Sequence, residues 1–403
     1  MLRLKSHITI SQKTSWNDKA RSEVIDFEFV REINIESSWQ NLTDRCKISF
    51  PKNIYVELSN GKIFPLKSVN ITEGNDTPPI FMRGDEVKID LGYIWFDGIE
   101  DQTEMVTEFE GYINAINNDM SIELDCEDDM WLLKQISTPN KTFSQSQGYT
   151  VGKMLREILE GKGFDVAVRD KVSAEIGDFI CVNTESVAKM LERLKKDYHL
   201  YTYIRRINGP AGVKKELRCA AIAYYPEDQK DVFNDRARDR EWIFDFNQNI
   251  ISSELKYFRK EDLNVHIKAI SKVTEVTGTT RSGKQKTKKK EVIIYVPDDK
   301  ILDCELKTYH YLNTTEAKMR VLATKQLNRM SYTGWRGSFT TFGMPSARHG
   351  DLCYLQSRAM PERNGQFLVK SLKKTFGVNG YRQVIELDMQ TDINTQQVTD
   401  EGL

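Results

Sequence analysis

Four carboxylates gather in one stretch of the sequence, namely Asp125, Glu127, Asp128 and Asp129. Gathered carboxylates can bind a divalent cation or act as a paired acid and base. Their spacing is not that of an EF-hand loop, and alternation along a strand sends neighbouring side chains to opposite faces. We therefore expect a solvated strand end ahead of the apolar residues 131–133, with a metal site as the alternative.

Short catalytic motifs are absent from the sequence. The five histidines stand singly and form no HExxH pair. They are His7, His199, His266, His310 and His349. The six cysteines form no CxxC pair, and several lie in apolar strand patterns, which predicts buried thiols. Because a nucleophile elbow and glycine-rich nucleotide loops are also missing, the sequence predicts no catalytic residue, no cofactor, no metal and no enzymatic activity.

The strongest run of charge in the sequence is basic and spans residues 279–290. Gly278 and Gly283 favour a mobile hairpin tip, between strands that end at Val276 and begin at Val292. A solvated tip is one interpretation. The other is contact with an acidic neighbouring subunit or with DNA phosphates, which needs charge but no reading of base sequence. The side chains concerned are Arg281, Lys284, Lys286, Lys288, Lys289 and Lys290.

The bulk composition is that of a folded protein with more than one domain. Hydrophobic residues make up 39% of the 403 residues and charged residues 29%, which excludes a wholly disordered chain. A chain of this length exceeds one hydrophobic core, so two or three domains are expected. The net charge of -1 gives no overall attraction to DNA or to a membrane surface. Residues 1–10 lack the apolar core of a signal peptide, so we expect synthesis in the cytoplasm and no membrane insertion.

Hydrophobic periodicity indicates which elements position these side chains. Short alternating strands separated by turn residues, as at 86–91 and 121–126, are typical of an antiparallel barrel or sandwich. Apolar stripes at helical spacing in 151–159 and 185–198 indicate two helices packed on a small sheet.

These patterns predict an α+β fold with mainly antiparallel β-structure. The expected arrangement is two related β-barrel domains with a small helix-containing α+β domain between them. The predicted limits are 1–135 for the first barrel, 136–245 for the middle α+β domain, 246–390 for the second barrel and 391–403 for a polar tail. The second barrel is expected to hold one helix at 314–330, capped by Asn313 or Thr314.

A weak repeat relates the two strand-rich ends of the chain. In each copy a Gly-Asp turn leads into one strand, a glycine turn leads into a second, and an alternating strand closes the unit. The first copy uses Gly84, Asp85, Gly111 and residues 122–125. The second copy uses Gly350, Asp351, Gly365 and residues 385–388. If one chain carries two related barrels, three chains present six similar units around one axis, so a trimer can meet a six-fold tube.

The chain resembles tail hub proteins of the late control protein D kind, which are related to the hub half of VgrG-type spikes. The resemblance follows the domain order over most of the chain. It is densest at residues 33–51, 111–133, 178–203 and 350–387. The closest likeness lies in 376–383, with Gly380 and Tyr381, and in Gly111-Tyr112-Ile113 leading to Glu127-Asp128. These signatures are structural and not catalytic.

The resemblance implies a homotrimer whose paired barrels form a pseudo-hexameric ring in a phage tail or baseplate. Such a ring docks on a tail tube protein on one side and holds a spike or tip protein on the other. It also implies a central channel through which DNA or an effector passes. The chain lacks the long C-terminal β-helix of VgrG, so a separate spike or tip protein is expected.

Two other classes of function stay open at this stage. A tail-associated cell-wall hydrolase needs convergent carboxylates, or a nucleophile beside its base. A receptor- or sugar-binding tail module needs exposed clusters of Trp and Tyr. In the hub interpretation the work is done by open strand edges, whose backbone groups pair with a neighbouring subunit.

Overall fold

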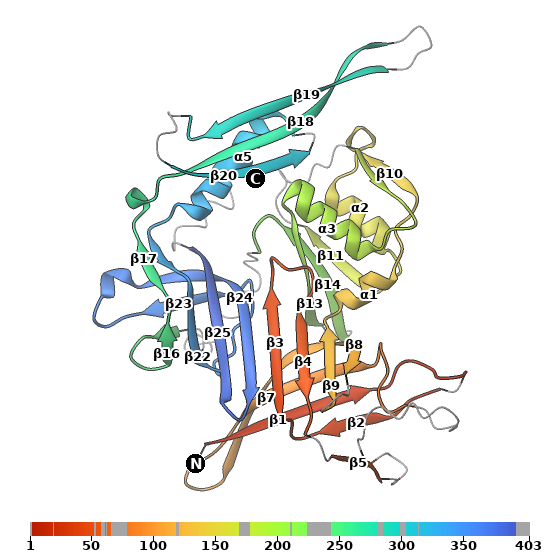
Figure 1. The fold of residues 1–403 in the computed structure, drawn as a ribbon, viewed down its shortest axis with the longest axis vertical. Helices are drawn as coiled ribbons and strands as arrows, with labels where there is room; N and C mark the ends of the chain where they lie inside the picture. The colour runs from red at the N-terminus through yellow and green to blue at the C-terminus, as the bar shows by residue number, and fades with distance from the viewer. Residues whose placement is uncertain are drawn as a thin grey trace.

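The computed structural model shows an α+β fold with mainly antiparallel strands, as the sequence predicted (Figure 1). It describes residues 2–18, 20–51, 54–57, 61, 63–65, 79–117, 121–168, 178–209, 212–223, 243–279, 285–298, 304–312 and 314–391. Strands from both ends of the chain join in one 13-stranded sheet, with the order β16-β22-β25-β24-β3-β4-β9-β8-β7-β1-β2, and with β15 and β23 off this path.

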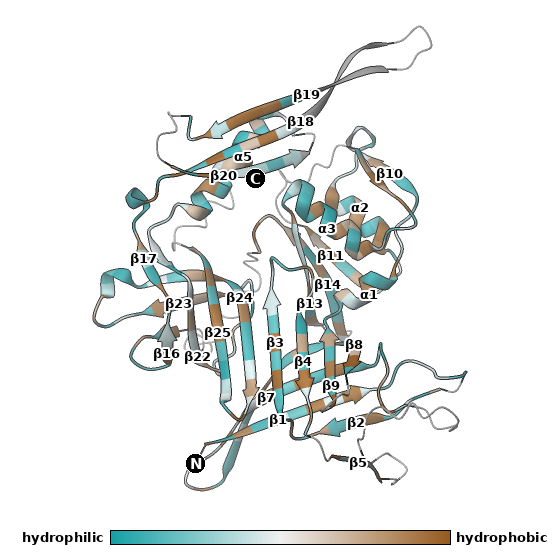
Figure 2. Cartoon of the chain, viewed as in Figure 1, coloured by the Kyte–Doolittle hydropathy of each residue, from teal (hydrophilic) through white to brown (hydrophobic). Residues whose placement is uncertain are grey.

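The N-terminal unit is built from the first nine strands. Seven of them belong to the large sheet: β1 (Leu2–Ser11), β2 (Val24–Phe27), β3 (Glu32–Ser38), β4 (Arg45–Ser49), β7 (Glu86–Phe96), β8 (Asp101–Asn117) and β9 (Glu123–Glu127). A separate hairpin is formed by β5 (Tyr55–Glu57) and β6 (Ile63–Pro65). Hydrophobic and hydrophilic residues alternate along these strands (Figure 2), which turns one face of the sheet to a core and the other to solvent.

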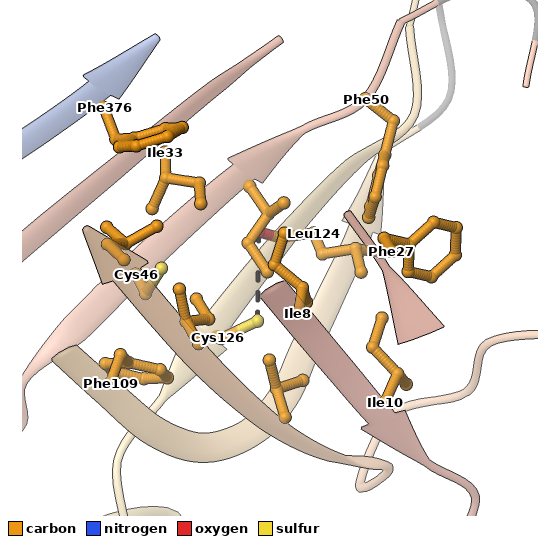
Figure 3. Close-up of a cluster of buried hydrophobic side chains, with 14 of the residues drawn as sticks. Ile8, Ile10, Phe27, Ile33, Cys46, Phe50, Phe109, Leu124, Cys126 and Phe376 are labelled. Carbon is orange, nitrogen blue, oxygen red and sulfur yellow. Dashed lines mark hydrogen bonds between the residues drawn. The ribbon is translucent and has the colours of Figure 1, made fainter. Parts of the chain in front are cut away.

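The core of the N-terminal unit lies where β1 and β7 cross β3, β4 and β9 (Figures 1 and 3). Ile8, Leu124 and Phe50 are fully buried there. Cys46 and Cys126 lie opposite each other on β4 and β9, and burial raises the pKa of both thiols. They therefore pack as small hydrophobic side chains, as the sequence predicted.

The middle unit follows the N-terminal unit and packs helices on a small sheet. Its helices are α1 (Met130–Gln135), α2 (Val151–Leu159) and α3 (Val187–Tyr198), with a 3-10 turn η1 (Gln145–Gln147). Its strands are β10 (Lys141–Ser144), β11 (Phe164–Val168), β12 (Asp178–Cys181), β13 (Tyr201–Gly209) and β14 (Gly212–Ala220). The predicted helices α2 and α3 are confirmed, and they begin after Thr150 and Ser186, whose side chains accept the capping hydrogen bonds.

The C-terminal unit contributes the other strands of the large sheet. They are β15 (Ile243–Asp245), β16 (Ile250–Ser253), β22 (Ser338–Phe342), β23 (Leu352–Gln356), β24 (Gly365–Gly377) and β25 (Gly380–Gln390). A short ladder of β17 (Lys256–Phe258) and β21 (Gly334–Arg336) extends β16 and β22, and η4 (Pro361–Arg363) precedes β24. Phe244, Phe339 and Phe367 are central to the core of this unit.

A further small unit, called here the inserted unit, interrupts the C-terminal unit. It consists of β18 (Val265–Thr279), β19 (Gln285–Val296), β20 (Glu305–Leu312) and α5 (Glu316–Met330), preceded by η3 (Lys260–Asp262). Its sheet has the order β19-β18-β20 and its own core with α5. The sequence predicted α5 but not a separate sheet, because strand patterns do not reveal which sheet a strand joins.

The predicted cap of α5 needs correction. The helix is capped at Thr315, one residue beyond Thr314, and no side-chain hydrogen bond closes this end. The backbone N–H of Thr314 instead donates to Ser271 Oγ at 3.0 Å, which ties the approach to the helix onto β18. Among the described residues, none of the helices combines the length and the apolar character needed to cross a membrane.

Candidate functional site: the repeated sheet units and their junction

The first predicted signature turn, Gly84-Asp85, leads into β7 and is fastened to β8. Gly84 N donates to Ile113 O at 2.8 Å, and Ile113 N donates back to Asp85 O at 2.9 Å. Met82 N donates to Asp85 Oδ2 at 2.8 Å, which closes the turn. Gly84 has a φ of +91°, a conformation that glycine adopts without strain.

The second predicted signature turn, Gly350-Asp351, repeats this pattern of bonds. Gly350 N donates to Val369 O at 2.9 Å, and Val369 N donates to Asp351 O at 2.8 Å. Arg348 N donates to Asp351 Oδ2 at 3.0 Å, and Gly350 has a φ of +82°. The two turns are therefore equivalent in backbone geometry, hydrogen bonding and place in the sheet.

The strands around these turns follow one plan in both units. The spatial order is β3-β4-β9-β8-β7 in the first unit and β16-β22-β25-β24-β23 in the second, with the same chain order. Each unit also has a bulge at the same place, because the register skips Asn114 between β8 and β9 and Lys370 between β24 and β25. Shared topology and a shared bulge are strong marks of a repeat.

The structural repeat differs in register from the repeat read in the sequence. Ile113 pairs with Cys126 just before the first bulge, as Val369 pairs with Leu387 just before the second. By these equivalences Gly111 corresponds to Phe367, whereas the sequence pattern matched Gly111 to Gly365, two residues earlier. A shift of two keeps every side chain on its face, so alternation alone cannot detect it.

Gly111 and the remaining signature glycines have distinct positions. A Cβ on Gly111 would lie 2.1 Å from Glu127 O, so only glycine fits where β8 passes β9. Gly365 is the first residue of β24 and Gly380 the first of β25.

The first two strands of each unit also correspond. Ile33 lies opposite Ile48 in β3 and β4, as Ser253 lies opposite Phe339 in β16 and β22. The same offset continues into β17 and β21, where Lys256 and Arg336 take the places of Glu36 and Arg45. In the first unit these strands are joined by residues 39–44, whereas in the second they are joined by residues 259–333, which carry the inserted unit.

The two units join through strand pairing between β24 and β3. The antiparallel register runs from Ser371 opposite Ser38 to Gly377 opposite Glu32. Phe376, which comes from β24, points into the core of the N-terminal unit beside Ile33 (Figure 3). The end of the β24–β25 hairpin is thus part of the core of the N-terminal unit, so the two units form one body.

A buried polar cluster fixes this junction. Glu108 of β8 binds Lys374 Nζ of β24 and Tyr381 Oη of β25, and Lys374 also donates to Ser346 Oγ at 2.7 Å. Burial lowers the pKa of Lys374, against the attraction of Glu108, and burial with the Glu108 charge raises the pKa of Tyr381. The sequence singled out Tyr381 but gave no signal for Glu108, which lies far away along the chain.

A cavity of about 750 Å³ lies beside this cluster, between the N-terminal, middle and C-terminal units. Asp129 binds Arg206 Nε at 2.6 Å and Lys215 Nζ at 2.8 Å, and Arg206 also reaches Glu110 at 2.8 Å. Asp125 is exposed, as expected for a solvated strand end, but that expectation was wrong for Glu127 and for Asp129, which is 3% exposed. The carboxylate is buried because two cations of the middle unit neutralise it.

The cavity lining also contains two neighbouring carboxylates, Asp44 and Asp128. His349 Nε2 lies 3.1 Å from Asp44 Oδ2, and Asp128 N donates to Asp44 O at 3.1 Å. Burial and the neighbouring charge of Asp44 raise the pKa of Asp128. Among the described residues, no three His, Cys, Asp or Glu side chains come together in a way that could hold a metal ion.

An arginine from outside the repeat holds each signature aspartate. Arg21 binds Asp85 through two hydrogen bonds of 2.9 Å, and both side chains are almost fully buried. Arg205 of the middle unit lies 3.8 Å from Asp351 and donates to His349 O at 2.5 Å. Asp85 thus anchors the chain before β2, whereas Asp351 contacts the middle unit.

Comparison with known proteins supports the fold. No protein-family model matches this chain, and no curated protein matches it by sequence. Among solved structures, a tail protein from Neisseria meningitidis MC58 matches with a TM-score of 0.55 and 11% identity, over 96% of this chain and 97% of that chain. The 43 kDa tail protein of prophage MuSo2 from Shewanella oneidensis matches with a TM-score of 0.51 and 12% identity, over 96% and 98%.

This chain has the fold of phage tail proteins. A chain of the lidded Francisella PdpA–VgrG complex also matches, with a TM-score of 0.50 and 9% identity, over 97% of this chain and 53% of that chain. The predicted resemblance to tail hub proteins is therefore confirmed at the level of the fold.

The basic residues lie differently in this tail-protein fold from what the sequence indicated. β18 continues to Thr279 and β19 begins at Gln285, so strand pairing replaces most of the predicted tip. The residues whose backbone lies in β19 are Lys286, Lys288, Lys289 and Lys290. Arg281 and Lys284 lie outside the described residues. Residues 285–290 are lysines with one Gln and one Thr and contain no turn signal, so the ladder extends through them.

Among the described residues, the large sheet has open strand edges at both ends of its order, β16 and β2, and also along part of β8. β16 ends the order of the large sheet, and β17, which extends it, pairs only with β21. Beyond Ile113, β8 pairs with β9 along one edge, and none of the described strands pairs with Ala115 or Ile116 along the other edge. Open edges of this kind are sites for pairing with another chain.

Proposed function

We propose that this chain is a structural hub subunit of a phage or phage-like tail, which forms a homotrimeric ring with pseudo-hexameric symmetry. In this proposal the ring joins the tail tube protein to a spike or tip protein. The chain is then a component of the virion tail or baseplate, made in the cytoplasm of the host. DNA or an effector passes through the centre of the ring.

The repeat of two sheet units in one chain is the observation that carries this proposal. Three chains with two equivalent units each give six units around an axis, which suits a tube of six-fold symmetry. The junction between β24 and β3 supports it further, because the two units are held in one fixed relation by strand pairing and by the Glu108 cluster. The two tail proteins of the same fold agree with this assignment.

Three of the five carboxylates that line the cavity favour a structural role over hydrolysis; Asp128, whose pKa is raised beside Asp44, is not among them. A glycosidase needs one carboxyl free to protonate the leaving group and another near it. Here Glu108, Glu110 and Asp129 are bound by lysine or arginine, which suits a junction between units. Turnover of purified peptidoglycan by the protein would favour the hydrolase instead.

Light scattering on the purified chain tests the proposal. The expected mass is three times the 46.7 kDa of one chain, alone or after addition of a tail tube protein. Electron micrographs should then show rings with six similar lobes. A protein that stays monomeric at every concentration, with and without tube protein, would contradict the hub assignment.

The basic residues of the β18–β19 hairpin are proposed as a contact with an acidic neighbour or with DNA phosphates. The proposal covers Arg281, Lys284, Lys286, Lys288, Lys289 and Lys290. It needs only positive charge at this hairpin, so its signature is sensitivity to salt.

A further inference from the structure

We propose that residues 115–117 of β8 pair, in antiparallel register, with residues 256–258 of β17 in a second copy of this chain. The inference rests on the proposed function, because it names the contact through which a ring closes. Within one chain β24 pairs with β3. The inference is that the equivalent strands, β8 and β17, pair in the same way between two chains.

The first edge of the proposed pairing, on β8, follows from the equivalence of β8 and β24. Ala115 lies opposite Asp125 just past the bulge, as Ser371 lies opposite Glu386 just past the second bulge. Ala115 therefore stands for Ser371, which pairs with Ser38 across the junction. By the same count Asn117 stands for Lys373, which pairs with Glu36 and binds it at 2.9 Å.

The second edge of the proposed pairing, on β17, follows from the equivalence of β3 with β16 and β17. Lys256 opposite Arg336 takes the place of Glu36 opposite Arg45. Phe258, two residues further, then takes the place of Ser38. Residues 251–254 and Lys256 are exposed, as an unoccupied edge requires. The predicted pairs are Ala115 with Phe258, Ile116 with Tyr257, and Asn117 with Lys256.

The faces of the two strands agree with this register. Ile116 packs against the core of the N-terminal unit, and Tyr257 packs against the core of the C-terminal unit. In the proposed pairing these two side chains stand opposite each other on the core side, while Ala115, Asn117 and Lys256 share the exposed side. A slip of one residue would place Ile116, which faces the core side, opposite Lys256 or Phe258 on the other face, so the register is specified.

The contact is expected to be shorter than its counterpart within the chain. Five residues separate Asn117 from Glu123 at the end of β8, whereas ten separate Lys373 from Val384 in the longer hairpin. The edge of β8 thus offers fewer backbone groups than the edge of β24. Because β8 meets β17 and not itself, the contact is head-to-tail, the type that closes into rings.

Disulfide trapping between separate variants tests the register. Asn117→Cys and Lys256→Cys are made as single variants and co-expressed, so a bond between the two new thiols joins two different chains. The matched control pairs Asn117→Cys with Glu254→Cys, which lies on the same face but two residues out of register. The unmodified chain reports any product from the native Cys304, which is half-buried.

The in-register pair should give about tenfold more interchain product under mild oxidation, because a disulfide needs Cα atoms within about 7 Å. Light scattering on the same samples reports the trimer independently. A trimer with equal or no trapping in the two pairs overturns the inference and leaves the hub proposal standing. Absence of any oligomer overturns both. If either cysteine variant fails to fold, Ala115→Cys with Phe258→Cys tests the same register.

Discussion

At the residue scale, the junction between the two units depends on Glu108 and the groups around it. Its side chain is 1% exposed and that of Lys374 is 5% exposed, so this ion pair is shielded from water. A buried charge is tolerated only where its partner and its hydrogen bonds are in place. The sequence pointed to Tyr381 through a motif, but the pairing with Glu108 joins residues 273 apart, which no local pattern reports.

Replacing Lys374 by Met should destabilise the protein by about 3–5 kcal/mol, because it leaves the Glu108 carboxylate buried without its cation. Chemical denaturation with near-UV circular dichroism measures the loss. The double variant Lys374→Met with Glu108→Gln should recover most of the stability, since the uncompensated charge is then gone. Equal losses in the single and double variants would show that the charge pair is not the cause.

Replacing Asp128 by Asn should stabilise the protein at neutral pH. The pKa of Asp128 is raised by burial and by Asp44, so its ionised form is less favourable in the folded chain than in the unfolded one. The parent gains stability as the pH falls through the raised pKa, and the variant does not, so their difference should shrink toward acid. Thermal unfolding from pH 8 to pH 4 checks this, and a constant difference would contradict it.

At the scale of elements, periodicity predicted strands and helices well but not their partners. The apolar stripes of α2 and α3 are local features, so the sequence could specify them. The separate sheet of the inserted unit was missed because β18 and β20 alternate just as sheet strands elsewhere do. The lengths of β18 and β19 were underestimated because the lysines carry no turn signal.

The inserted unit is docked by one buried ion pair from α5. Arg329 Nε lies 2.9 Å from Asp388 Oδ1 of β25, and both side chains are under 10% exposed. Arg329→Met should cost about 3 kcal/mol, because the Asp388 carboxylate would stay buried and unpaired. Hydrogen exchange should then rise in α5 and β25 together. Arg320→Met, on the same helix, removes an exposed ion pair with Asp298 and is the control. An equal effect there would contradict a specific contact between α5 and β25.

At the scale of the whole molecule, the sequence predicted a repeat but not the continuity of the sheet. The Gly-Asp turns could be matched because glycine and aspartate at a strand entry leave a visible pattern. The pairing of β24 with β3 could not be foreseen, since it joins the two ends of the chain through backbone atoms that every residue has. The N-terminal and C-terminal units, which the sequence predicted as separate domains, thus share one sheet.

The proposed contact of the basic β18–β19 hairpin forms only between assembled subunits, so it is tested by measuring assembly. Changing Lys286, Lys288, Lys289 and Lys290 to Gln should weaken assembly with the tube or neighbouring subunit by about thirtyfold at low salt, given about 0.5 kcal/mol for each exposed ion pair. The difference should vanish at high ionic strength, where charges are screened. Sedimentation of assembled rings at two salt concentrations measures this, and assembly equal to that of the parent would exclude a role for these charges.

The place of the inserted unit, between two strands that a six-residue link joins in the other repeat, has an evolutionary consequence. A connection at the rim of a sheet can grow, shrink or be exchanged while the strands beneath it keep their partners. Under the proposed function, related hub subunits could therefore change the surface that they expose by altering this one connection, without disturbing the repeat beneath it. In the proposed ring, the strands that face the tube protein would remain under the separate constraint of fitting it.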